Sequence, residues 1–199
     1  MSKGKVIVVT GIPGVGKTTV VNELKNLAHK SGKRVNVITY SSVMLDIAHR
    51  KNYSTERDDL RHKSIHFQQC LQNEAAKEIK KMIQESEIAI IDTHMVIRTD
   101  YGYWAGLPLN VLKELKPDAF ILIEAVPEEI TERRQKDSTR TRDKEAIKEI
   151  IIEIEASRSM AALCSMVTNA PFKLITNPQG KQLEAAEAIL EIINKICEA

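Results

Sequence analysis

The chain has 199 residues, of which 43% are hydrophobic and 28% are charged, and its formal net charge is +2. This length suits a single domain that spans residues 1–199, and this composition provides a buried core, which excludes an intrinsically disordered chain. The near-neutral charge argues against a basic scaffold for nucleic acids, so we expect no strong nucleic-acid binding.

The sequence contains no apolar run of the roughly 18 residues that a membrane helix needs, and its N-terminal segment lacks the long apolar region of a secretory signal. The three cysteines, Cys70, Cys164 and Cys197, are widely separated and odd in number. Such scattered cysteines are typical of proteins in a reducing compartment and not of proteins held together by disulfide bonds. We therefore expect a cytoplasmic protein that is not attached to a membrane.

Short apolar segments alternate with longer segments that have helical periodicity. The apolar segments are rich in β-branched residues and indicate strands that are buried on both faces: 6–9, 35–38, 88–91, 119–123 and 172–175. The predicted helices span residues 17–31, 61–85, 145–166 and 182–197. This alternation predicts an α/β fold with a five-stranded parallel sheet covered by helices on both sides. Residues 41–66 and 133–144 are polar and charged, and we expect them to be surface excursions that carry function.

The first predicted strand leads directly into a complete phosphate-loop motif, G-x-x-x-x-G-K-[ST], which opens the first predicted helix. The motif consists of Gly11, Ile12, Pro13, Gly14, Val15, Gly16, Lys17, Thr18 and Thr19. Its glycines allow several N–H groups to turn inward and bind an anion at the positive end of the helix. We expect Lys17 to reach the β- and γ-phosphates of ATP, and the Thr18 hydroxyl to bind Mg²⁺. The alternative is a plain glycine-rich turn, which the complete motif in this context disfavours.

The third predicted strand ends in Asp92, which Thr93 and His94 follow. A carboxylate beside a phosphate loop can bind the hydration shell of Mg²⁺ or orient the attacking group. The alternative for Asp92 is a turn or cap residue. His94 either contacts substrate or caps a helix.

The arginines bear on which molecule accepts the phosphoryl group. No Asn-Lys-x-Asp run, which reads guanine in GTPases, follows the later strands, so small-molecule kinases and ATPases remain. Four arginines fall within ten residues: Arg133, Arg134, Arg140 and Arg142. Guanidinium groups bind phosphate bidentately, and a kinase whose acceptor is itself a phosphate needs such charge but no general base. A solvated charged turn is the alternative for this run.

Four segments together resemble archaeal adenylate kinases, which are P-loop nucleoside monophosphate kinases. They are the phosphate loop, Asp92-Thr93-His94, residues 102–108 and the arginines from Arg134 to Arg142. The resemblance covers essentially the whole chain. It implies a P-loop NTPase fold of three α/β/α layers, with an AMP-binding excursion at 41–66 and a short lid at 133–144. It also implies the reversible, Mg²⁺-dependent transfer of a phosphoryl group from ATP to AMP giving two ADP, and a homotrimer.

The resemblance also implies roles for individual residues. On the ATP side, Arg134 would stack on the adenine, and Asn177 and Gly180 would lie beside it. The AMP site would comprise Ser41, Arg57, Arg61, Asp92, His94, Arg98 and Gly106. The catalytic residues would be Lys17, Arg98, Arg140 and Arg142, and the Mg²⁺ ligands, directly or through water, would be Thr18 and Asp92. Asp46 stands where the wider family often places an arginine for the AMP phosphate, so Arg57 or Arg61 would supply that charge.

The residues by themselves leave two other functions open. One is a kinase for a different nucleoside monophosphate or for a small alcohol. The other is a nucleotide-regulated ATPase that acts in RNA or ribosome assembly.

Overall fold

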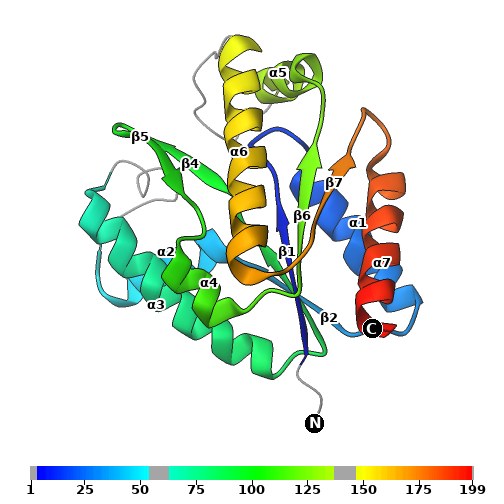
Figure 1. Ribbon diagram of the computed structural model, residues 1–199, viewed down its shortest axis with the longest axis horizontal. Helices are drawn as coiled ribbons and strands as arrows, with labels where there is room; N and C mark the ends of the chain where they lie inside the picture. Colours follow the sequence, from blue (N-terminus) through cyan, green and yellow to red (C-terminus); the bar gives the residue numbers. More distant parts are fainter. Residues whose placement is uncertain (1–3, 54–62, 137–146, 199) are drawn as a thin grey trace.

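The computed structural model describes residues 4–53, 63–136 and 147–198. Its centre is a five-stranded parallel sheet with the strand order β2-β3-β1-β6-β7, as Figure 1 shows. The strands are Lys5–Thr10 (β1), Val35–Thr39 (β2), Ile88–Asp92 (β3), Ala119–Glu124 (β6) and Phe172–Thr176 (β7). The five predicted strands and their parallel arrangement are therefore confirmed.

The central strands are buried on both faces, which explains their continuous apolar sequences. Every residue of β3 and of β6 is buried, and in β1 only Lys5 is not. Because side chains alternate along a strand, β1 sends Val6 and Val8 to one face of the sheet and Ile7 and Val9 to the other. The two faces build two separate hydrophobic clusters.

One face is covered by the first and last helices, α1 (Lys17–Lys30) and α7 (Gln182–Glu198). Their buried residues recur at helical spacing: Val20, Val21, Leu24 and Ala28 in α1, and Ala185, Ala186, Ile189 and Ile193 in α7. Figure 1 shows these two helices side by side, although they lie at opposite ends of the chain.

The opposite face is covered by α2 (Tyr40–Arg50), α3 (Ile65–Gln84), α4 (Leu109–Leu115) and the later turns of α6 (Ile147–Thr168). Together with α1 and α7 these helices complete the predicted three-layer α/β/α architecture. The helices predicted at 17–31, 61–85, 145–166 and 182–197 correspond to α1, α3, α6 and α7 in the described residues.

Five short elements were not predicted from the sequence: the helices α2, α4 and α5 (Pro127–Lys136), and the strands β4 (Val96–Thr99) and β5 (Gly102–Ala105), which form a hairpin. Helix α2 begins the predicted excursion 41–66 and packs Val43, Met44 and Ile47 into the core. Its apolar face was obscured by the charged residues around it. Helix α5 buries only Ile130, so it has no apolar periodicity to detect.

No helix within the described residues combines the length and the apolar character that a membrane span requires.

Candidate active site

The phosphate loop lies at the carboxyl edge of the sheet, where ligands bind in open parallel sheets. It connects β1 to α1, and β1 lies between β3 and β6. The neighbouring strands end in Asp92 and Glu124, and both carboxylates are buried. The loop therefore lies between two acidic strand ends.

The backbone of the loop requires its glycines. Gly14 has φ of 92° and Gly16, the N-cap of α1, has φ of 84°, which is a left-handed conformation that side chains disfavour. Gly11 is required for a different reason, because a Cβ there would lie 2.6 Å from the carbonyl oxygen of Ile123. These angles are those of a loop that turns its N–H groups toward an anion.

Lys17 and Asp92 form an ion pair between Nζ and Oδ1 at the centre of this edge. Both side chains are about one-tenth exposed, at 10% and 11%. The other carboxylate oxygen of Asp92 accepts a hydrogen bond of 3.3 Å from the Thr39 hydroxyl at the end of β2. The structure thus brings two predicted catalytic and metal-site residues together. Thr18 and Thr19 are exposed on the first turn of α1, one and two residues beyond Lys17.

His94 contacts the phosphate loop directly. Its Nδ1 lies 2.7 Å from the Gly11 carbonyl oxygen, within hydrogen-bonding distance. The segment that carries His94 is packed tightly against Gly106, whose N–H donates to the Met95 carbonyl at 2.8 Å. A Cβ at Gly106 would lie 1.8 Å from the His94 carbonyl oxygen, so this position accepts only glycine without movement of the backbone.

Arg133 and Arg134, in the last turn of α5, also donate to the phosphate loop. Arg133 Nη1 donates to the Val15 carbonyl at 3.1 Å, and Arg134 Nε donates to the Pro13 carbonyl at 2.9 Å. Each guanidinium is paired with a glutamate: Arg133 with Glu129 and Arg134 with Glu153, both at 2.8 Å. The Arg134–Glu153 pair is 9% exposed on each side and links α5 to α6.

The segment after β7 reaches the loop through Asn177. This residue is completely buried, its Nδ2 donates to the Val15 carbonyl at 2.7 Å, and its own N–H donates to the Glu124 carbonyl at 2.7 Å. Gly180 lies further along, exposed and with φ of 79°. Asn177 therefore contacts the loop backbone, while Gly180 lies at the surface.

A pocket of about 480 Å³ borders these residues. Its lining comes from the end of β6 and the loop after it, from the first turn of α5, from α6 and from the two neighbours of Asn177: Glu124, Ala125, Val126, Pro127, Glu129, Ile151, Ile154, Glu155, Arg158, Thr176 and Pro178. Arg158 spans the wall of the pocket and donates to both carboxylate oxygens of Glu124, at 2.7 and 2.6 Å. This hydrogen-bonded pair raises the pKa of the Arg158 guanidinium.

Arg98 lies on the other side of the loop, on the β4–β5 hairpin, where it pairs with Tyr103 across the two strands. Its side chain is half exposed and its Nη1 donates to Glu149 of α6 at 3.2 Å. Ser41 lies in the first turn of α2 and is half-buried. The predicted AMP-side residues within the described chain thus come from β3, α2 and the hairpin.

The buried Gln72 of α3 supports this hairpin. Its amide Nε2 donates to the Ala105 carbonyl at 3.3 Å, and its Oε1 accepts from the Trp104 indole N–H at 3.3 Å. Tyr40 OH donates to the Gln72 backbone carbonyl at 2.6 Å. Burial raises the pKa of the Tyr40 hydroxyl, which therefore keeps its proton as a donor.

Four predicted site residues lie outside the described residues: Arg57 and Arg61 of the expected AMP side, and Arg140 and Arg142 of the expected lid.

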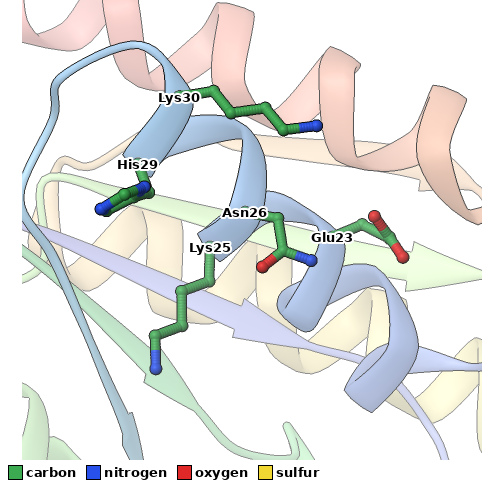
Figure 2. A pocket seen from close by; sticks show the side chains of 5 residues that line it. All are labelled: Glu23, Lys25, Asn26, His29 and Lys30. Atoms are coloured by element: carbon green, nitrogen blue, oxygen red, sulfur yellow. The ribbon is translucent and has the colours of Figure 1, made fainter.

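A second hollow, of about 330 Å³, lies on the surface of α1 and is not part of this site (Figure 2). Glu23, Lys25, Asn26, His29 and Lys30 line it, all from the turns of α1 beyond Thr18. Figure 2 shows that their side chains do not converge on a common point. A ligand there would meet one helix only.

Four residues of the site were not predicted from the sequence: Thr39, Gln72, Glu124 and Arg158. Arg133 was expected as part of the arginine run, but its contact with the loop backbone was not. A signal was available for Glu124, because it ends an apolar strand as Asp92 does. Thr39 also ends its strand. The partners of Arg133 and Arg158 are distant in the sequence, so no local pattern indicated them.

Comparison with known proteins identifies relatives over nearly the whole chain. Residues 10–151 match the family described as AAA domain. The chain is 42% identical to the adenylate kinase of Thermoplasma acidophilum over 186 residues, which are 94% of this chain and 97% of that protein. It is 38% identical to the adenylate kinase of Methanocaldococcus jannaschii, with 96% and 99% covered, and 40% identical to that of Methanopyrus kandleri, with 97% and 100% covered.

Solved structures show the same fold at low sequence identity. A shikimate kinase from Bacteroides thetaiotaomicron has a TM-score of 0.62 and 14% identity, and covers 96% of this chain and 98% of its own. The protein TT1252 from Thermus thermophilus has a TM-score of 0.57 and 14% identity, with 98% of both chains covered. These similarities establish the architecture alone.

Proposed function

The chain belongs to the adenylate kinase family and shares its activity, the transfer of a phosphoryl group between ATP and AMP, and we propose that the site around Lys17 and Asp92 carries out this transfer. The observation that carries the proposal is that the phosphate loop and the Lys17–Asp92 pair lie together at the carboxyl edge of the sheet, in a chain about 40% identical to adenylate kinases.

ATP binds with its phosphates on residues 11–19. The inward N–H groups of the loop and the start of α1 attract the phosphate oxygens, and Lys17 neutralises charge on the transferred group. The base of ATP occupies the pocket beside the loop, between Val126, Pro127 and Pro178. Arg134 donates from Nε to the Pro13 carbonyl of the loop and pairs with Glu153, and we propose that it borders the base of ATP.

The oxygen donors present suit Mg²⁺. No group of three or more His, Cys, Asp or Glu side chains within residues 4–53, 63–136 and 147–198 is arranged to bind a metal ion. Mg²⁺ is commonly bound by one or two protein oxygens together with substrate phosphates, and the Thr18 hydroxyl and the Asp92 carboxylate offer such oxygens. Mg²⁺ would neutralise phosphate charge during the transfer.

AMP binds on the side of β3, α2 and the β4–β5 hairpin. The acceptor phosphate is already an anion, so no side chain has to remove a proton from it. The Arg98 guanidinium can bind that phosphate. Its ion pair with Glu149 is half exposed, so replacing this pair by a phosphate contact costs little free energy. Ser41, His94 and Gly106 line the same side. Arg57, Arg61, Arg140 and Arg142 supply further charge from the excursion and the lid, which together exclude water and so prevent hydrolysis of ATP.

We also propose that three copies assemble through the later turns of α6 and the adjacent edge strand β7. This surface exposes apolar side chains that a monomer would leave in water: Leu163, Met166, Val167, Phe172 and Leu174. A cytoplasmic location is part of the same proposal.

An acceptor panel tests the proposed function. ADP production from ATP is measured with AMP, CMP, UMP and dTMP as acceptors, and also without an acceptor. The proposal requires AMP to be the best acceptor and ADP production to be slow in its absence. A preference for a pyrimidine nucleotide, or ADP release that RNA stimulates without AMP, would contradict it.

A further inference from the structure

Three carbonyl groups of the phosphate loop accept hydrogen bonds from side chains of other elements. The Gly11 carbonyl oxygen lies 2.7 Å from His94 Nδ1, and the Pro13 carbonyl accepts a hydrogen bond of 2.9 Å from Arg134 Nε. The Val15 carbonyl accepts two hydrogen bonds, from Asn177 Nδ2 at 2.7 Å and from Arg133 Nη1 at 3.1 Å. The donors come from the segment after β3, from α5 and from the segment after β7.

The spacing of these carbonyls matters because a peptide bond is planar and trans. Each peptide plane carries the carbonyl of one residue and the N–H of the next residue, and these two groups point in opposite directions. Donors that bind the carbonyls of Gly11, Pro13 and Val15 therefore direct the N–H groups of residues 12, 14 and 16 to the other side. Of the two intervening carbonyls, that of Ile12 accepts a hydrogen bond from the Val15 N–H within the loop at 3.4 Å.

The loop needs these donors because its inward conformation is not stable by itself. Inward N–H groups carry partial positive charges that repel one another, and the left-handed angles at Gly14 and Gly16 are readily lost by a loop with no other support. Arg133 is itself well held, because it also donates to Glu129 at 2.8 Å, to Gln179 at 3.1 Å and to the Asn177 carbonyl at 3.1 Å.

We propose that Arg133 and Asn177 are positioning residues for the triphosphate of ATP, acting together through the Val15 carbonyl so that the loop is ordered before the ligand arrives. Neither residue needs to touch a phosphate in this account, since Glu129 neutralises the charge of Arg133 and Asn177 is neutral. The inference rests on the proposed function, because it requires that the loop bind a triphosphate.

Calorimetry with inorganic tripolyphosphate and Mg²⁺ tests the proposal, because this ligand has no base and reports on the loop alone. We expect Arg133→Met and Asn177→Ala each to weaken tripolyphosphate binding about tenfold, as the loss of one hydrogen bond predicts. We expect the Kd for AMP to stay unchanged, and Arg133→Lys to recover part of the loss. Arg34→Met is the matched control, since Arg34 also pairs with a glutamate, Glu87, but on an exposed surface.

A double-mutant cycle distinguishes positioning from direct contact. Because both side chains act on one carbonyl, the double variant should lose less affinity than the product of the two single losses. Additive losses, or a loss in Arg133→Met with none in Asn177→Ala, would indicate that Arg133 binds phosphate itself and would overturn the proposal. Asn177→Ser replaces Asn177→Ala if the latter does not fold. If the wild-type chain itself failed to bind tripolyphosphate, the proposed function would be refuted as well. If the wild type binds and only the variants behave differently from expectation, the positioning proposal alone fails.

Discussion

At the scale of single residues, we propose that phosphoryl transfer depends most on Lys17. It lies at the start of α1, and its amine forms an ion pair with Asp92 at the edge of the phosphate loop. Asp92 also accepts a hydrogen bond from the Thr39 hydroxyl on its other carboxylate oxygen, a contact that does not involve Lys17. Removal of the amine should therefore affect catalysis far more than folding.

We predict that Lys17→Ala lowers kcat by about 10²- to 10³-fold, the usual loss for one group that stabilises transition-state charge. Steady-state kinetics in the direction of ADP formation measures it, with circular dichroism to check the fold. Lys25→Ala is the control, because Lys25 is an exposed lysine of the same helix. Turnover of Lys17→Ala within twofold of the wild type would remove Lys17 from the mechanism.

Substitution of Arg98 tests the proposed AMP site. Its pair with Glu149 is half exposed, so its contribution to stability is about 1 kcal/mol or less. We predict that Arg98→Ala raises the KM for AMP at least tenfold and leaves the Kd for ATP within twofold, because a charge-assisted contact to phosphate is lost. Initial-rate kinetics at varied AMP concentration measures the KM for AMP, and calorimetry measures the Kd for ATP. Equal losses for both nucleotides would contradict the assignment.

At the scale of elements, one buried amide side chain forms two hydrogen bonds to the β4–β5 hairpin. Gln72 contacts both Ala105 and the Trp104 indole, and the same hairpin carries Arg98. We predict that Gln72→Met lowers the free energy of unfolding by about 1–3 kcal/mol, because the Trp104 N–H and the Ala105 carbonyl lose their partner. The KM for AMP should rise, while the KM for ATP should not.

Trp104 makes this prediction easy to follow, because it is the only tryptophan in the chain. Its fluorescence should become more accessible to acrylamide in Gln72→Met than in the wild type. Gln69→Met, an exposed glutamine of the same helix, is the control. Unchanged quenching in Gln72→Met would show that the amide does not hold the hairpin.

The elements also show how far the sequence could be interpreted. Each of the five strands ends one residue beyond the apolar run that indicated it, and each of these last residues is polar: Thr10, Thr39, Asp92, Glu124 and Thr176. A search for apolar runs stops at those residues, although two of them, Asp92 and Glu124, flank the phosphate loop. The short helices escaped prediction because α5 buries a single side chain and α2 lies within a charged segment.

The candidate site was predictable where its residues are contiguous. The phosphate loop is one unbroken motif, so its sequence defines it, and Asp92 follows an apolar strand. Arg133 and its acceptor Val15 are 118 residues apart, and an arginine donor can pair with any carbonyl. Contacts of that kind arise from the packing of α5 against the loop, which no local pattern encodes.

At the scale of the whole molecule, the apolar surface of α6 and β7 tests the proposed assembly. Met166 is 73% exposed there. We predict that Met166→Lys converts the assembly to monomers, because a charge buried in an apolar interface costs several kcal/mol. Sedimentation velocity measures the oligomeric state. Leu109→Lys, at an exposed position on α4, should leave the assembly intact, and a trimeric Met166→Lys would place the interface elsewhere.

In the proposed reaction, one chain binds two nucleotides with their phosphates end to end across Lys17. Calorimetry with a ligand in which five phosphates join two adenosines measures whether both sites exist in one chain. We predict one ligand per chain, bound far more tightly than ATP or AMP alone, with weaker binding in both Lys17→Ala and Arg98→Ala. Binding no tighter than that of ATP, or insensitivity to Arg98→Ala, would contradict it.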